Sequence, residues 1–218
     1  MSGEALHAVI DDLGALLLFT MILIVAAGQI YRAIYAVAAQ SLLIAIAAAV
    51  LAAATGHGDL LVIAGITLAV KATLLPCVLH RVVQRINVRR EVEPVIPIAA
   101  TLALAVVIVV VSFELSASLG PVRQAITGNA LPVGIALTLT GVLVMATRKT
   151  ALTQMVGLFA SENGIFFTEM SVTEGMPLII EIGVILDVIL AALVMAIMVL
   201  RVRSTIDADI ADLDRLRG

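Results

Sequence analysis

The chain has 218 residues, of which 62% are hydrophobic and 13% are charged. A soluble domain contains about 45–50% apolar residues, so this composition excludes an ordinary soluble globule and indicates an all-α polytopic membrane protein. The net charge of −3 offers no basic surface for nucleic acid, and a single cysteine excludes an intrachain disulfide.

Seven apolar segments are each long enough to cross a bilayer, whose core of about 30 Å needs roughly 20 helical residues. The first has an acidic flank instead of the positive flank of a signal peptide, so we expect it to remain as a helix. Short connections with glycine, proline or charged residues separate most of the segments. The predicted spans are 13–31, 33–54, 60–80, 95–113, 131–147, 151–170 and 177–200.

The basic residues indicate an orientation for these spans. Cytoplasmic loops carry an excess of lysine and arginine. All but two of the 13 basic residues fall in alternate loops or after the last span, namely Arg32, Arg81, Arg85, Arg89, Arg90, Arg148, Lys149, Arg201, Arg203, Arg215 and Arg217. Arg123 lies on the other side, and Lys71 lies inside a span. We therefore expect an N-terminus outside, in the periplasm, and a cytoplasmic C-terminus.

Three ionisable residues fall near the middle of three different spans. At 1.5 Å per helical residue, Glu162 and Lys71 lie about 16 Å from the ends of their spans, and Asp187 about 15 Å. Glu181 lies roughly 6 Å from the outer end of the last span. A charge at the centre of a membrane helix costs about 2.5–3.5 kcal/mol on insertion scales, so such residues are usually functional.

Two interpretations of these groups stay open. The first is a structural ion pair between Lys71 and one carboxylate. The second is a hydrated path along which the groups exchange protons, since burial disfavours the charged forms of acids and amines. The matched depth favours the path. Glu169 shares a helix face with Glu162 nearer the outer surface, as a proton exit or as an interfacial charge.

Other features carry less chemistry. His7, His57 and His80 lie at or beyond span ends, which argues against haem, and no phosphate-binding loop or redox motif is present. We expect no metal or cofactor on this chain. Cys77 is interpreted as a small buried hydrophobe, and Pro76 is expected to kink the third span just after Lys71.

The residues after the last span form a separate short segment, 204–218. Ile206, Ile210 and Leu213 share one helical face, and the opposite face is acidic. Anionic lipid would repel that acidic face, so this amphipathic tail either docks on a protein partner or stays a solvated tail.

The stretch "MVGLFASENGIFF" brings a family resemblance. The region 131–203 resembles the three-helix K subunit of respiratory complex I and the C subunit of multisubunit sodium/proton antiporters. Gly157, Leu158 and Asn163 match that pattern. Phe159 stands where those subunits have a carboxylate, and Glu162 lies nearly one turn further on. The second family carboxylate corresponds to Asp187 in "GVILDVILAALV".

With a four-helix region at 1–130 in front of that module, the chain is similar to the E subunit of hydrogenase-4. "SENGIFF", "IIEIGVILDV" and "VKATLLPCVLHR" carry this likeness. It implies a multi-pass subunit in the bacterial inner membrane, without its own redox centre, within a complex I-related [NiFe]-hydrogenase or formate hydrogenlyase-like assembly. The implied partners are antiporter-like subunits, a membrane subunit like the H subunit of complex I, and hydrogenase and iron–sulfur subunits.

The resemblance also implies roles for the ionisable residues. Glu162 and Asp187 would carry protons as paired acids, Lys71 would modulate or bridge them, and Glu181 would connect them to the outside. Two rival functions remain. One is a subunit of a cation/proton antiporter that needs no redox substrate, and the other is a structural membrane scaffold.

Overall fold

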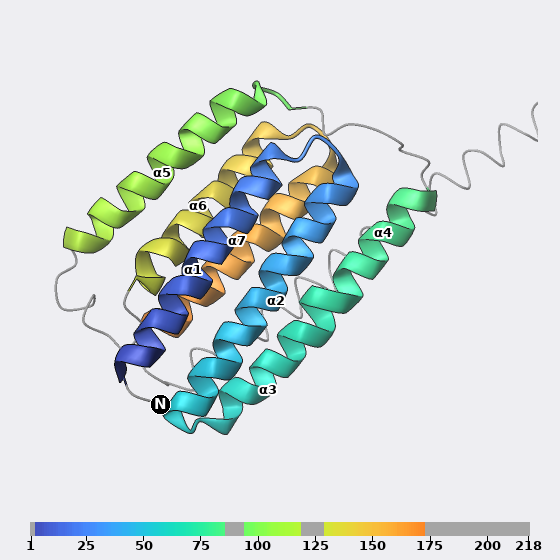
Figure 1. The fold of residues 1–218 in the computed structure, drawn as a ribbon. Helices are drawn as coiled ribbons and strands as arrows, with labels where there is room; N and C mark the ends of the chain where they lie inside the picture. Colours follow the sequence, from blue (N-terminus) through green and yellow to red (C-terminus); the bar gives the residue numbers. More distant parts are fainter. Residues whose placement is uncertain (1–2, 86–93, 119–128, 173–218) are drawn as a thin grey trace, which may run out of the picture.

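The computed structural model describes residues 3–85, 94–118 and 129–172. The described residues form a bundle of long helices (Figure 1). In chain order the elements are α1 (Gly3–Ala26), α2 (Ile30–Thr55), α3 (Gly58–Thr67), the π-helical segment η1 (Leu68–Leu74), α4 (Leu75–Arg85), α5 (Ile98–Ser118), α6 (Ala130–Thr147) and α7 (Ala151–Val172).

The all-helical fold predicted from the sequence is confirmed for the described residues. Within the described residues, five helices are long and apolar enough to cross a membrane: Gly3–Ala26, Ile30–Thr55, Gly58–Arg81, Ile98–Ser118 and Ala130–Thr147. The sixth predicted span, 151–170, forms α7, which is of similar length but carries more polar residues. The seventh, 177–200, lies outside the described residues, so the count of seven stays a prediction.

Several predicted boundaries differ from the observed ones, and two of the differences have a clear physical reason. The first helix begins at Gly3 instead of residue 13, because acidic residues such as Glu4 are favourable near a helix N-terminus and do not end the helix. Its connection to α2 accordingly lies at 27–29, before the predicted turn. The fourth helix begins at Ile98 instead of residue 95, since Val95 instead donates its N–H to the Thr147 carbonyl at 2.8 Å.

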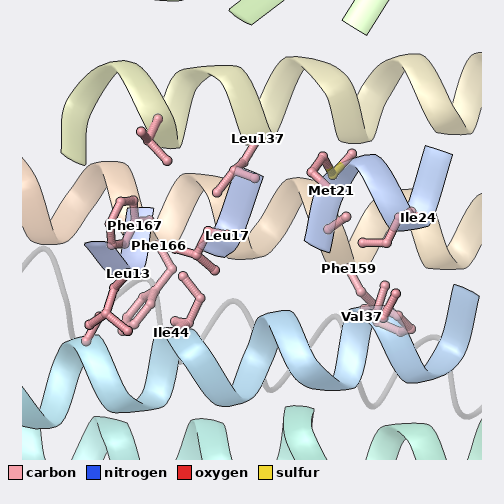
Figure 2. Close-up of a cluster of buried hydrophobic side chains, with 14 of the residues drawn as sticks. Leu13, Leu17, Met21, Ile24, Val37, Ile44, Leu137, Phe159, Phe166 and Phe167 are labelled. Carbon is pink, nitrogen blue, oxygen red and sulfur yellow. The ribbon is translucent and has the colours of Figure 1, made fainter. Parts of the chain in front are cut away.

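The apolar core lies between α1, α2, α6 and α7. Figure 2 shows side chains of these four helices meeting there. Outside this core, α5 packs on α6 and α1, whereas α3, η1 and α4 pack along α2 (Figure 1). The labelled members of the core are Leu13, Leu17, Met21, Ile24, Val37, Ile44, Leu137, Phe159, Phe166 and Phe167.

Helices α6 and α7 approach each other closely through glycines. A Cβ atom at Gly141 would lie 2.5 Å from the backbone nitrogen of Ser161, and one at Gly164 would collide with Thr138. A separation this small admits no side chain at these positions, as in other membrane helix pairs that meet through small residues. The close pairing fixes α7, and thereby Glu162, against the rest of the bundle.

The two ends of the bundle differ in charge. The described arginines lie near one end, where α1 finishes, α2 begins, α4 finishes and α6 joins α7. At the other end the Asp11 carboxylate of α1 accepts hydrogen bonds from the backbone and side chain of Asn129, which precedes α6. This separation is what the expected orientation requires, although the side on which each end lies stays a prediction.

Candidate functional site

Lys71 lies in a widened helical turn. In η1 the Leu75 N–H donates to the carbonyl of Val70, five residues earlier, and the Thr73 hydroxyl reaches the Leu68 carbonyl at 3.0 Å. Pro76 follows, and its ring would clash with the carbonyl four residues before it. A π-helical turn relieves that clash, so the distortion expected at Pro76 takes this form and includes Lys71 itself.

Lys71 and Glu162 form a buried ion pair. The Lys71 Nζ atom lies 3.5 Å from Glu162 Oε2, and each side chain is 7% exposed. The pair joins η1 to α7, so the helices that carry these two residues adjoin and hold them at one level. Removing two charges from water is costly, and a buried pair recovers that cost only with good geometry and further polar partners.

A neutral polar cluster lies beside the pair. Asn163 follows Glu162 in α7, and its Nδ2 donates to Gln40 Oε1 at 3.2 Å and to Ser41 Oγ at 3.0 Å. The Gln40 Nε2 contacts the sulfur of Met21 at 3.8 Å. Asn163, Gln40 and Ser41 are at most 1% exposed. This cluster connects α7 to α2 and, through the sulfur, to α1.

Sequence reasoning did not identify Gln40 and Ser41 as site residues. A signal for them was nevertheless present, because they are two adjacent polar residues within a long apolar segment. Gln40 is ten residues from the start of α2 at Ile30, about 15 Å along the helix. The depth calculation that singled out Lys71 therefore places Gln40 near the same level.

The other predicted site residues lie away from the Lys71–Glu162 pair or outside the described residues. Glu169 is half-buried, about two turns after Glu162 on α7. Asp187 and Glu181 lie outside the described residues. Cys77 is exposed on the outer surface of α4, so its interpretation as a buried hydrophobe was wrong. Helix α4 packs on the bundle through the side that carries Leu75, Leu79 and Val83, and Cys77 lies on another side of the helix.

His80 contacts aromatic and amide side chains and has no partner that would hold a metal ion with it among the described residues. The His80 ring lies at 5.0 Å from Tyr31 and 6.1 Å from Tyr35, measured between ring centroids, and its Nε2 is 2.9 Å from Gln84 Nε2. Among the described residues, no group of three histidine, cysteine or acidic side chains is placed to hold a metal ion.

The contact between Lys71 and Glu162 couples the protonation states of the two side chains. A proton delivered to Glu162 would neutralise the carboxylate and remove its attraction for the Lys71 ammonium, 3.5 Å away in a medium of low dielectric constant. The protonation of one member therefore changes the electrostatic energy of the other strongly. Such coupling can serve either a static pair or a path that carries protons.

Comparison with known proteins finds a relative in Mycobacterium tuberculosis (strain ATCC 25618 / H37Rv). The chain is 35% identical over 151 residues to the "Uncharacterized protein Rv0085" of that organism. The match covers 69% of this chain and 68% of the relative. No family model matches the chain, and no solved structure matches it.

Proposed function

The chain belongs to the family of the Mycobacterium tuberculosis protein Rv0085, and we propose that it acts as a membrane-arm subunit of a complex I-related [NiFe]-hydrogenase or formate hydrogenlyase-like complex. In this proposal the subunit carries no redox centre. It contributes ionisable groups to a path for protons through the membrane, and the hydrogenase, iron–sulfur and antiporter-like subunits are its partners in the bacterial inner membrane.

The observation that carries the proposal is the Lys71–Glu162 pair. Glu162 belongs to the stretch that resembles the K subunit of complex I, whereas Lys71 belongs to the N-terminal region that such short subunits lack. The two are in contact at 3.5 Å and nearly buried. When a buried acid and a buried amine are in contact, the protonation of one affects the protonation of the other. Proton relays in membrane helices use ionisable groups of this kind.

The proposed roles follow from position. Glu162 and Asp187 act as proton-carrying acids, and Lys71 adjusts the proton affinity of Glu162 through its charge. Glu169, further along α7, and Glu181 lead towards the outer surface. A purely static ion pair is the competing explanation, and it differs from the relay in the effect of neutralising Glu162.

Glu162→Gln is the first test of the relay. Glutamine keeps the shape of the side chain but cannot carry a proton, so we expect proton pumping by the intact complex in proteoliposomes to be abolished. Hydrogen oxidation or evolution with an artificial dye should remain, because that chemistry takes place on other subunits. Glu114→Gln is the matched control, since Glu114 is an exposed carboxylate on α5. Unchanged pumping in Glu162→Gln, with the control normal, would refute the relay.

The identity of the complex has its own test. Mild detergent extraction through a tag on this chain, followed by mass spectrometry, should recover nickel-hydrogenase and iron–sulfur subunits beside large antiporter-like chains. Recovery of antiporter subunits alone, without any redox protein, would instead assign the chain to a cation/proton antiporter. In that case the carboxylates would belong to an ion-exchange site driven by a pH gradient.

A further inference from the structure

A groove lies between α1, α5 and α6, where α5 packs at the edge of the bundle (Figure 1). Its volume is about 300 Å³. The groove opens at the surface of the bundle, because Ile22, Val106 and Val110 line it and are each more than half exposed. Ala105 of α5 and Thr140 of α6 also line it and are nearly buried, so short side chains form its floor.

The lining of this groove suits an apolar ligand and not water. Among the described residues that line it, Thr140 alone has a polar side chain. A buried water needs at least two polar partners, whereas an apolar cavity of about 150 Å³ stays dry and binds a molecule as large as benzene. The groove is about twice that size and open to the side, so hydrocarbon is the material that fills it best.

The groove has nearly the length of one bilayer leaflet. It extends over eight residues of α5, from Leu102 to Val110, and over seven residues of α1, from Val25 to Leu18. At 1.5 Å per residue these stretches measure about 12 Å and about 10 Å. Half of a hydrocarbon core of about 30 Å is about 15 Å. One acyl chain that enters from the nearer membrane surface would therefore lie along α5 and end close to the bilayer centre.

One end of the groove lies at the end of the bundle that carries the described arginines. Val25 is in the last turn of α1, and its carbonyl accepts the hydrogen bond from Arg148 Nη2 at 2.6 Å. The Nη1 atom of Arg148 is buried without a hydrogen-bond acceptor among the described residues, and no described carboxylate forms an ion pair with it. Its positive charge is thus not offset in the described part of the chain, and it attracts an anionic group near this end.

We propose that the groove binds one acyl chain of an anionic phospholipid, which belongs to the leaflet at the arginine-bearing end of the bundle. The chain fills the space between α5 and the two helices beside it, and the charge of Arg148 favours a negative headgroup at the membrane surface. A neutral phospholipid would make the same apolar contacts without that attraction. This inference does not rest on the proposed function, because it needs only a bilayer around these helices.

The first test is a cryo-electron microscopy map of the protein with its native subunits, in nanodiscs that contain phosphatidylglycerol and phosphatidylcholine. We expect an elongated density between Leu102 and Val110, with its headgroup at the Val25 end. Ala105→Phe should remove this density, because the ring occupies the groove. Ala103→Phe is the matched control at an exposed position of the same helix, and it should keep the density. A groove that is empty, or that holds a protein helix, in a map with lipids resolved elsewhere would overturn the proposal.

The second test measures the preference for the headgroup. A ligand that binds the native state raises the unfolding temperature, so delipidated protein is titrated with phosphatidylglycerol or phosphatidylcholine during thermal unfolding. We expect the wild type to bind phosphatidylglycerol about five-fold more tightly, as one basic residue near an anionic headgroup provides. Arg148→Gln keeps an amide donor for the Val25 carbonyl but has no charge, so it should bind the two lipids equally.

The opposite results are equally specific. Equal affinity of the wild type for both lipids would overturn the anionic headgroup, and a preference retained in Arg148→Gln would overturn the role of Arg148. Stabilisation of Ala105→Phe to the same extent as the wild type would overturn the groove as the site. The map of the wild-type protein needs no substitution, so it decides the question if a variant fails to fold.

Discussion

Arg148 shows how one side chain can serve structure at the end of a membrane bundle. The sequence explains this arginine by topology alone, as one of the basic residues between two spans. In the structure its side chain is 2% exposed, and Nη2 donates to the Val25 carbonyl at 2.6 Å. That carbonyl is one of the last four of α1, which have no partner within the helix and carry partial negative charge. Burial lowers the pKa of the Arg148 guanidinium from its ordinary value.

We therefore expect Arg148→Ala to destabilise the protein. The substitution leaves the Val25 carbonyl without its donor and opens a gap between α1 and α6. The loss of the hydrogen bond alone should cost about 1–3 kcal/mol in the free energy of unfolding. Thermal unfolding in detergent would measure it. Arg81→Ala is the control, because Arg81 is exposed on α4; equal effects of the two substitutions would contradict a structural role for Arg148.

At the scale of elements, the pairing of α6 with α7 determines where Glu162 lies. The two helices approach so closely that backbone atoms occupy the space of a side chain at Gly141 and Gly164. Since α7 also carries Asn163, a small change in the distance between these helices would move the charged pair and the polar cluster together. Close packing thus links helix geometry to the candidate site.

Gly141→Ala tests this link. Its new Cβ would lie 2.5 Å from the Ser161 nitrogen, so the helices must separate. Overpacking of this kind typically costs about 1–3 kcal/mol, and we expect a lower unfolding temperature and reduced pumping. Gly65→Ala is the matched control in α3, where an added Cβ meets nothing within 4 Å. It should be neutral or stabilising by up to about 1 kcal/mol through helix propensity. A harmless Gly141→Ala would show that the close approach is not required.

At the scale of the whole molecule, the outer surface is suited to a lipid environment. Helix α5 presents a row of exposed valines, Val106, Val107, Val110 and Val111, each more than half exposed. An apolar row of this length along one helix is unfavourable in water. Polar and charged side chains are instead buried at Lys71 and Glu162. This inversion is the expected pattern for a bundle whose interior is more polar than its lipid-facing surface.

Orientation can be measured by cysteine labelling. In a Cys77→Ser background, His57→Cys places a thiol between α2 and α3, and Lys149→Cys places one between α6 and α7, at the opposite end. We expect a membrane-impermeant maleimide to label position 57 in right-side-out vesicles and position 149 only after permeabilisation, because basic loops stay in the cytoplasm. The reverse pattern would invert the orientation, and labelling of both from one side would contradict the span count between them.

The sequence by itself determined those features that depend on local composition. The length of an apolar segment relative to bilayer thickness predicts which helices are long enough to span a membrane, and the helical rise gives the distance of Lys71 and Glu162 from the ends of their helices. Helix ends were less predictable, as α1 shows, because acidic residues are compatible with the first turns of a helix and apolarity does not mark its start.

The tertiary structure alone decided which residues meet. The contact of Lys71 with Glu162, the junction of Gln40 and Ser41 with Asn163, and the burial of Arg148 depend on how each helix is rotated and which neighbour it packs against. The seven-residue π-helical segment before Pro76 sets the direction in which Lys71 points, and glycine contacts set the position of α7. These contacts depend on packing between segments that are far apart in the sequence, so the composition of any one apolar segment does not predict them.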